Sequence, residues 1–200
     1  MFKRKFFHRG NYIKLAVCGV RPGAGAMHAA LTIANYLSSK KKQDVIFIEL
    51  SATSRIFQLL SDQSLALDSS LGYPYRGVTY VPACSVSQAR DILISSRASV
   101  VVAIGELNSA SDAIFSLCQK QLVIGCMAPW CSESYVSFIR NKLIKFHDIK
   151  QISFCGINLN KIEKQTFKRM YDCNIRPMPY IKNPFCLSEK DFPLIDQLLL

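Results

Sequence analysis

The chain alternates between short apolar runs and longer segments of helical periodicity, and this alternation constrains its fold most. The apolar runs are rich in β-branched residues and lack polar alternation, as expected for strands buried on both faces of a parallel sheet. The predicted strands are Ile13–Val20, Asp44–Leu50, Val78–Pro82, Ser99–Ile104, Gln121–Met127, Ile152–Leu159 and a short run near Ile175–Tyr180. The predicted helices are Met27–Ser39, Ser85–Ser96, Ser132–Phe146 and Asp191–Leu200.

Strands and helices that alternate along a whole chain are typical of the α/β class. We therefore expect a three-layer α/β/α fold with a doubly wound, mostly parallel, Rossmann-like sheet. Residues 13–200 are predicted to form this single domain, after a basic N-terminal arm at residues 1–12. The segment Ser61–Arg76, which contains Ser, Gly and Pro, is predicted to be a loop.

The composition indicates a globular protein. Of the 200 residues, 50% are hydrophobic, which is enough to bury a substantial core and excludes a wholly disordered, collagen-like or coiled-coil chain. No apolar stretch approaches the roughly 18–20 residues that cross a bilayer. We therefore expect a cytoplasmic protein, with a peripheral position at the inner face of the membrane as an open alternative.

The positive charge is concentrated in the N-terminal part of the sequence. The formal net charge is +11, and nine of the 25 Lys and Arg residues precede Asp44, the first acidic residue. Such a surface favours contact with an anionic membrane, a nucleic acid or an acidic partner. The alternative is a tail whose phenylalanines pack on the core. The candidate contact residues of this arm are Lys3, Arg4, Lys5 and Arg9.

The eight cysteines are predicted to be reduced thiols rather than a disulfide framework or a zinc site. They include no Cys-x-x-Cys pair, and Cys18, Cys126 and Cys155 lie inside apolar, strand-like runs. A free cysteine in a core behaves as a small hydrophobic residue. The spacing therefore favours cytosolic thiols over metal ligands.

The turn after the first predicted strand has the shape of a phosphate-binding loop. It reads Arg-Pro-Gly-Ala-Gly-Ala-Met-His over residues 21–28, directly before the first predicted helix. Gly23 and Gly25 permit a tight turn and a close backbone approach, and the helix N-terminus offers N–H groups to an anion. In a doubly wound sheet, ligands bind at the carboxyl ends of the strands, where this turn is expected to lie.

The side chains of this turn lack the charges of a working P-loop, Gly-x-x-x-x-Gly-Lys-[Ser/Thr]. Ala26 stands where that motif has the lysine that contacts the phosphates, and Met27 stands where it has the hydroxyl that binds Mg²⁺. Phosphoryl transfer depends on electrostatic stabilisation of the developing charge. The turn therefore predicts a cradle of backbone amides without the charges of catalysis.

The run Val17–Leu37 resembles the deviant P-loop of the MinD/ParA family of ATPases, K-G-G-x-G-K-[ST]-[ST] followed by an Ala/Leu-rich helix. Arg21 stands at the position of the family's signature lysine, and Gly23 and Gly25 match its glycines. The positions that depart from the pattern are Pro22, Ala26, Met27 and His28.

Three further segments resemble this family in the same order along the chain. The strand that ends at Glu49 resembles the family's D-x-D strand, with the second carboxylate replaced by Ser51. The run ASVVVAIG resembles D-Y-V-V-I-D-L-G, with Ala103 in place of the Walker B aspartate. The run GINLNK resembles G-V-V-L-N-K, which puts Asn160 at the adenine-contacting asparagine, and Pro179 matches an I-P segment near the base.

The resemblance implies a P-loop NTPase-like nucleotide site that has lost its catalytic charges. We expect no catalytic and no metal-binding residue, because the lysine, the hydroxyl and the carboxylate are missing together. No cofactor is certain, and weak binding of ATP, ADP or phosphate stays open. The residues of this vestigial nucleotide or anion site are Arg21, Gly23, Ala24, Gly25, Ala26, Met27, Glu49, Asn160 and Pro179.

The resemblance also implies a role. Members of the family dimerise across the nucleotide face and place partners on a membrane or chromosome. A member without the ATP cycle is expected to act as a scaffold, localisation or regulatory factor for a protein partner, as a homodimer or as a heterodimer with an active relative. TadZ/CpaE-like members, which localise pilus assembly machinery, fit this description.

Two other function classes stay open. One is a nucleotide-dependent enzyme, either an ATPase with an atypical loop or an NAD(P)-dependent oxidoreductase, since the loop also fits G-x-x-x-G-x-G from Gly19 onward and Glu49 could hold a ribose hydroxyl. The Tyr-x-x-x-Lys pair of such oxidoreductases occurs only at Tyr36 and Lys40, directly after the turn. The other class is a non-specific nucleic-acid-binding protein.

Trp130 is expected to be a packing residue.

Overall fold

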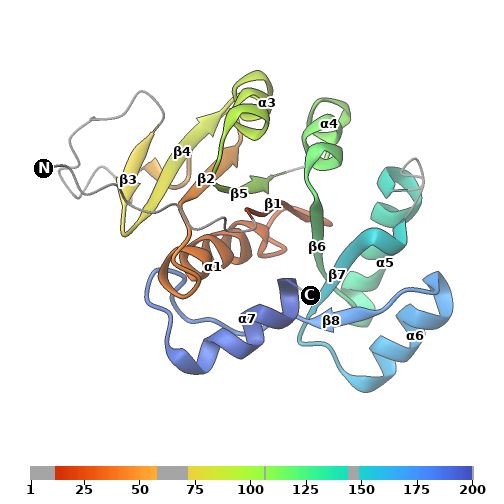
Figure 1. Ribbon diagram of the computed structural model, residues 1–200. Helices are drawn as coiled ribbons and strands as arrows, with labels where there is room; N and C mark the ends of the chain where they lie inside the picture. Colours follow the sequence, from red (N-terminus) through yellow and green to blue (C-terminus); the bar gives the residue numbers. More distant parts are fainter. Residues whose placement is uncertain (1–11, 58–71, 106, 144–148, 200) are drawn as a thin grey trace, which may run out of the picture.

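The computed structural model describes residues 12–57, 72–105, 107–143 and 149–199, and these residues form an eight-stranded sheet with helices on both faces (Figure 1). The strands are β1 (Lys14–Gly19), β2 (Val45–Leu50), β3 (Tyr73–Tyr75), β4 (Val78–Cys84), β5 (Ser99–Ile104), β6 (Lys120–Cys126), β7 (Ile152–Ile157) and β8 (Ile175–Pro177). Their order in the sheet is β3-β4-β2-β5-β1-β6-β7-β8, and every neighbouring pair except β3 and β4 is parallel. The predicted α/β/α fold is confirmed.

Each of the seven predicted strands has a counterpart in the sheet, and the eighth strand corrects our loop prediction for Ser61–Arg76. Residues 73–75 of that segment form the edge strand β3, which pairs antiparallel with β4. Arg76 and Gly77 between the two strands both have positive φ angles, 48° and 80°, as in a type I′ hairpin turn. The rest of the segment up to residue 71 lies outside the described residues.

The helices are α1 (Ala26–Ser39), α3 (Val86–Ser95), α4 (Ser109–Leu117), α5 (Pro129–Phe138), α6 (Lys161–Tyr171) and α7 (Phe192–Leu199). The predicted helix Ser132–Phe146 begins earlier, because Pro129 takes the first helical position, and it continues as a π-helical segment at Ile139–Leu143. Helices α4 and α6 were not predicted. Both begin with a capping box, at Asn108 and at Asn160.

The helices form two layers around the sheet. Tyr36 and Leu37 of α1 and Ile195 of α7 belong to the core on one face, whereas α3, α4, α5 and α6 bury residues such as Phe115 and Phe167 in the core on the other. Within the described part of the chain, no helix combines the length and the hydropathy of a membrane span.

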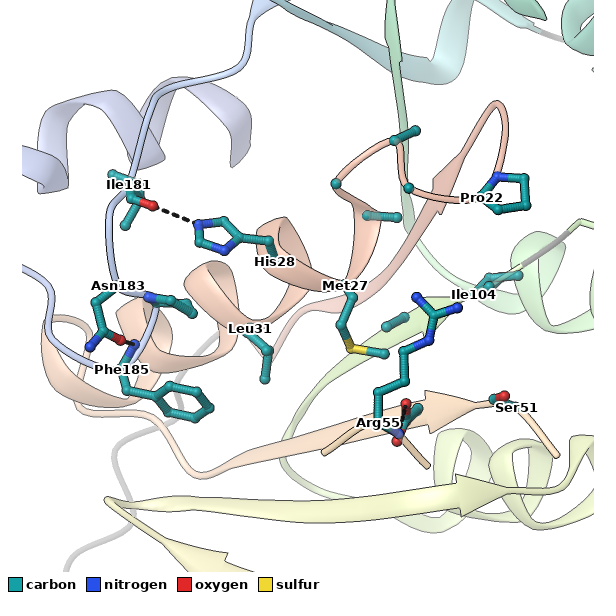
Figure 2. Close-up of a pocket in the computed structure, with 18 of the residues that line it drawn as sticks. Pro22, Met27, His28, Leu31, Ser51, Arg55, Ile104, Ile181, Asn183 and Phe185 are labelled. Atoms are coloured by element: carbon teal, nitrogen blue, oxygen red, sulfur yellow. Dashed lines mark hydrogen bonds between the residues drawn. The ribbon is translucent and has the colours of Figure 1, made fainter. Parts of the chain in front are cut away.

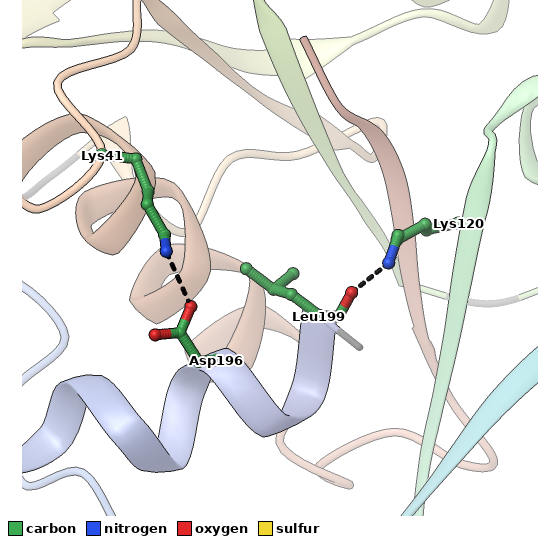
Figure 3. A network of polar contacts seen from close by, with 4 residues as sticks. All are labelled: Lys41, Lys120, Asp196 and Leu199. Atoms are coloured by element: carbon green, nitrogen blue, oxygen red, sulfur yellow. Dashed lines mark hydrogen bonds and ion pairs between the residues drawn. The ribbon is translucent and has the colours of Figure 1, made fainter. Parts of the chain in front are cut away.

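Helix α7 closes the α1 face of the sheet. Lys41 Nζ lies 3.0 Å from a carboxylate oxygen of Asp196, and Lys120 Nζ donates to the Leu199 carbonyl oxygen (Figure 3). The side chains of Lys41 and Asp196 are both 43% exposed, so their ion pair contributes little to stability. The buried Ile195 and Leu198 hold the helix in place instead, which also fixes the end of the segment that precedes it.

The cysteines occupy the predicted strand positions. Cys18 lies in β1, Cys126 ends β6 and Cys155 lies in β7, and all eight cysteines are free. Burial raises the pKa of Cys84 to about 11 and that of Cys155 to about 12. These two groups are therefore protonated thiols at neutral pH and pack as small hydrophobic residues.

Candidate functional site

The glycine turn joins β1 to α1 at the carboxyl end of a central strand. Gly23 and Gly25 have positive φ angles of 78° and 87°, which residues with a side chain rarely adopt. Gly25 is the N-cap residue of α1, and no side chain caps this helix. The turn therefore presents helix N–H groups that have no side-chain acceptor, which is the backbone arrangement of an anion cradle.

A cavity of about 1460 Å³ lies over this turn. Its walls come from the glycine turn, from the ends of β2 and β5 with the loops after them, and from residues 180–191. Figure 2 shows Pro22 and Arg55 toward one end of the cavity, and Ile181 and Phe185 toward the other. The cavity thus lies where doubly wound folds bind their ligands.

The cavity brings together the positions that lack the family's charges. Ala26 and Met27 begin α1, Ala103 lies near the end of β5, and all three line the same space. Ala103 is the register partner of Glu49 in the neighbouring strand β2. Three positions at which the chain departs from the family's motifs therefore lie at one location in the molecule.

These side chains do not fit a Mg²⁺ ion. Met27 offers no hydroxyl and Ala103 no carboxylate, and Ser51 stands where the family's strand has its second carboxylate. Among the residues that the structure describes, there is no group of three or more His, Cys, Asp or Glu side chains that could hold a metal. Because Mg²⁺ takes oxygen ligands, the side chains at Met27 and Ala103 offer it nothing to bind.

Glu49 organises the loop after β2. Its carboxylate is 1% exposed and accepts hydrogen bonds from Ser54 Oγ at 2.7 Å and from the Arg55 backbone N–H at 2.8 Å. Both donors belong to the loop, so the carboxylate fixes where this loop leaves the strand. Glu49 lines the cavity, but its hydrogen bonds to Ser54 and Arg55 give it a positioning role there.

Three cationic side chains line the cavity: Arg21, Arg55 and Lys182. Arg21 is exposed at the glycine turn, and its Nη2 lies 3.5 Å from Cys131 Sγ at the start of α5. Arg55 and Lys182 are also exposed and come from segments far apart in the sequence. Nothing in the local sequence around Arg55 and Lys182 marked them as site residues.

Asn160 and Pro179 do not line the cavity. Asn160 is the N-cap residue of α6, where its Oδ1 accepts from the Glu163 backbone N–H at 2.9 Å and its own N–H donates to Glu163 Oε2 at 2.9 Å. The structure therefore places Asn160 in a helix cap, outside the lining of the cavity. The residues after Pro179, from Tyr180 onward, reach the cavity.

The substitution Asn160→Ala is expected to lower the free energy of unfolding by about 1 kcal/mol through loss of the cap, and to leave ADP affinity unchanged. Urea unfolding and ADP titration measure the two effects. Asn108→Ala, which removes the equivalent cap of α4, is the matched control for stability. Weaker ADP binding by Asn160→Ala at unchanged stability would instead show that this side chain reaches the ligand.

The segment between β8 and α7 folds back over α1 to form one wall of the cavity. His28 Nε2 lies 2.7 Å from the Ile181 carbonyl oxygen, to which it donates (Figure 2). Farther along, Arg76 Nη1 donates to the Phe185 carbonyl oxygen at 2.7 Å. The ring of Phe185 also packs 6.2 Å from that of Tyr80. His28 is thus a tether for this segment, which the sequence did not reveal.

Two further expectations can be compared with the structure. Trp130 is 84% exposed, so our expectation that it packs in the core is wrong. Tyr36 is fully buried and, like Lys40, does not line the cavity, so this pair is not placed as an oxidoreductase requires. The basic residues Lys3, Arg4, Lys5 and Arg9 lie outside the described residues.

No protein-family model matches the sequence, and no curated protein is significantly similar to it. Similarity is found among solved structures. A plasmid partition protein of Borrelia burgdorferi, bound to AMPPNP, is 12% identical over 94% of this chain and 97% of its own, with a TM-score of 0.66.

Two other solved structures are comparable. The ATP complex of Cyanothece McdA is 14% identical, with 94% of each chain covered and a TM-score of 0.62. The MinC:MinD cell division complex of Aquifex aeolicus is 12% identical over 92% of this chain and 93% of that chain, with a TM-score of 0.64. The chain therefore has the fold of the ParA/MinD ATPases.

Proposed function

We propose that this protein is a non-hydrolysing relative of the ParA/MinD ATPases that serves as a scaffold, localisation or regulatory factor for a protein partner. The shared fold and the cavity over the glycine turn support a descent from nucleotide-binding proteins, since two of the similar structures hold AMPPNP or ATP. The loss of the lysine, the hydroxyl and the carboxylate of the family's motifs supports the proposal that the protein does not hydrolyse ATP.

The observation that carries the proposal is that Ala26, Met27 and Ala103 line one cavity. A single loss could be compensated by a neighbouring group. Together the three residues leave no cation at the lysine position, no hydroxyl for the metal and no metal-site carboxylate. Because phosphoryl transfer depends on electrostatic stabilisation of the transferred group, this combination removes the means of catalysis.

The purified protein is expected to release no phosphate from Mg²⁺–ATP above a protein-free blank. A malachite-green assay over a range of protein concentrations measures this, with an active ParA-type ATPase as the positive control. Phosphate release that requires Mg²⁺ and rises in proportion to the concentration of this protein would overturn the proposal.

A partner surface at the rim of the cavity fits this role. Arg21 contacts Cys131 in the first turn of α5, and Trp130, the residue before Cys131 in the sequence, is 84% exposed. Exposed Trp and Arg are enriched in the energetically dominant parts of protein interfaces. The similar MinD structure is a complex with MinC. The partner proposed for this rim is a second copy of the chain or an active relative.

A further inference from the structure

The cavity is lined by one more cationic side chain than carboxylates, since Arg21, Arg55 and Lys182 stand against Glu49 and Asp191. The two carboxylates that line it, those of Glu49 and Asp191, already have donors: Glu49 accepts from Ser54 and Arg55, and Asp191 Oδ2 accepts from Ser188 N and Oγ at 2.7 and 2.8 Å. Within the described part of the chain, the guanidinium of Arg55 forms no hydrogen bond or ion pair.

The position of Arg55 matches the missing charge of the glycine turn. Its backbone is held by the buried carboxylate of Glu49, so the start of the side chain is fixed. From there the side chain extends toward the turn, and its guanidinium lies in the part of the cavity that also contains Met27 and Ile104 (Figure 2). A cation from the β2 loop thus reaches the region where Ala26 provides none.

The opposite end of the cavity has a different chemistry. Leu31 of α1, Ile181 and the ring of Phe185 line it, and Figure 2 shows them away from Arg55 and Pro22. A ligand that fills both ends therefore needs an anionic part and a flat or apolar part. The volume of about 1460 Å³ exceeds the roughly 300–1,000 Å³ of ordinary small-molecule pockets, so a nucleotide-sized ligand has room.

We propose that this cavity binds a nucleoside diphosphate without a divalent metal, with Arg55 and Arg21 contacting the phosphates in place of the lysine and Mg²⁺. The guanidinium group suits this task, because its planar array of donors matches phosphate oxygens. The base lies toward Leu31, Ile181 and Phe185. The inference rests on the proposed function, since a metal-free site is one that binds without hydrolysing.

Isothermal titration of the full-length protein with ADP tests this assignment. Equal affinity in EDTA and in Mg²⁺ is expected, because Met27 and Ala103 provide neither the hydroxyl nor the carboxylate that would hold the ion. Pyrophosphate alone and adenosine alone are each expected to bind more weakly than ADP, since each fills one end of the cavity. An ADP affinity that disappears in EDTA overturns the metal-free assignment, and tighter binding of pyrophosphate than of ADP overturns the nucleoside part.

The substitution Arg55→Gln is expected to weaken ADP binding by about tenfold or more, because it removes a charge-assisted contact to phosphate. Arg90→Gln is the matched control, because Arg90 is an exposed arginine on α3 that does not line the cavity. Equal affinity of the two variants overturns the role of Arg55. These results are separate from the phosphate-release assay: hydrolysis of Mg²⁺–ATP contradicts the proposed function, whereas failure to bind metal-free ADP contradicts only this inference.

Discussion

Replacing Tyr135 with alanine is expected to lower the free energy of unfolding by about 3–5 kcal/mol. Tyr135 is fully buried on α5, and its ring centroid lies 5.4 Å from that of Phe167 in α6. Its hydroxyl donates to the carbonyl oxygens of Val123 at 3.1 Å and Cys155 at 3.2 Å, which belong to the adjacent strands β6 and β7. One side chain therefore holds a helix to two strands.

The close fit around the Tyr135 ring explains why the Tyr135→Ala variant would contain an empty cavity in its core. A Cβ atom at Gly125 would lie 2.5 Å from the Tyr135 ring, so the strand reserves this space for the aromatic side chain. Urea unfolding followed by circular dichroism measures the loss. Tyr135→Phe is the control, because it keeps the ring and removes the hydroxyl, at an expected cost of about 1 kcal/mol. Equal losses for the two variants would contradict the importance of the ring.

The strands could be predicted from sequence because the sheet is covered on both faces. Strands β2 and β5 are buried at every position, and an uninterrupted apolar run is the pattern that such burial requires. Helix α6 buries only Phe167 fully and is otherwise mostly polar, so it has too few apolar residues to be predicted as a helix that packs on the core. A better signal was the capping box, in which an asparagine and the residue three positions later accept hydrogen bonds from each other's backbone N–H groups. Asn160 and Glu163 form such a pair.

The residues of the candidate site also fall into those that could be predicted from the sequence and those that could not. The glycine turn and the positions of Ala26 and Met27 could be predicted, because they are consecutive and follow a strand. Arg55 and Phe185 could not, because they reach the cavity through the strand order and through a segment that folds back over α1. Asn160 was predicted from a local match to a family motif, and in the structure it caps α6 outside the lining of the cavity.

Restoring the Walker B carboxylate by Ala103→Asp is expected to lower the free energy of unfolding by about 3 kcal/mol at about pH 8, and not to create an ATPase. Ala103 is 2% exposed and is the register partner of Glu49, which is 1% exposed. The new carboxylate would therefore lie on the same face of the sheet as a buried one. The cationic side chain of Arg55 lines the same cavity, but it is exposed to solvent and therefore offsets only part of this cost. Repulsion between the two groups favours the protonated form of the introduced acid.

The charge can be separated from the change of shape by pH and by a neutral control. Because burial and repulsion raise the pKa of the introduced carboxyl in the folded protein, its cost is full at about pH 8 and decreases toward about pH 5 as the group takes up a proton. Ala103→Asn has nearly the same size and no charge, so its stability should not recover in this way. Thermal unfolding of both variants with and without Mg²⁺ completes the measurement. A stability of Ala103→Asp that Mg²⁺ fully restores would contradict our conclusion that Met27 and Ser51 leave the ion without its remaining protein ligands.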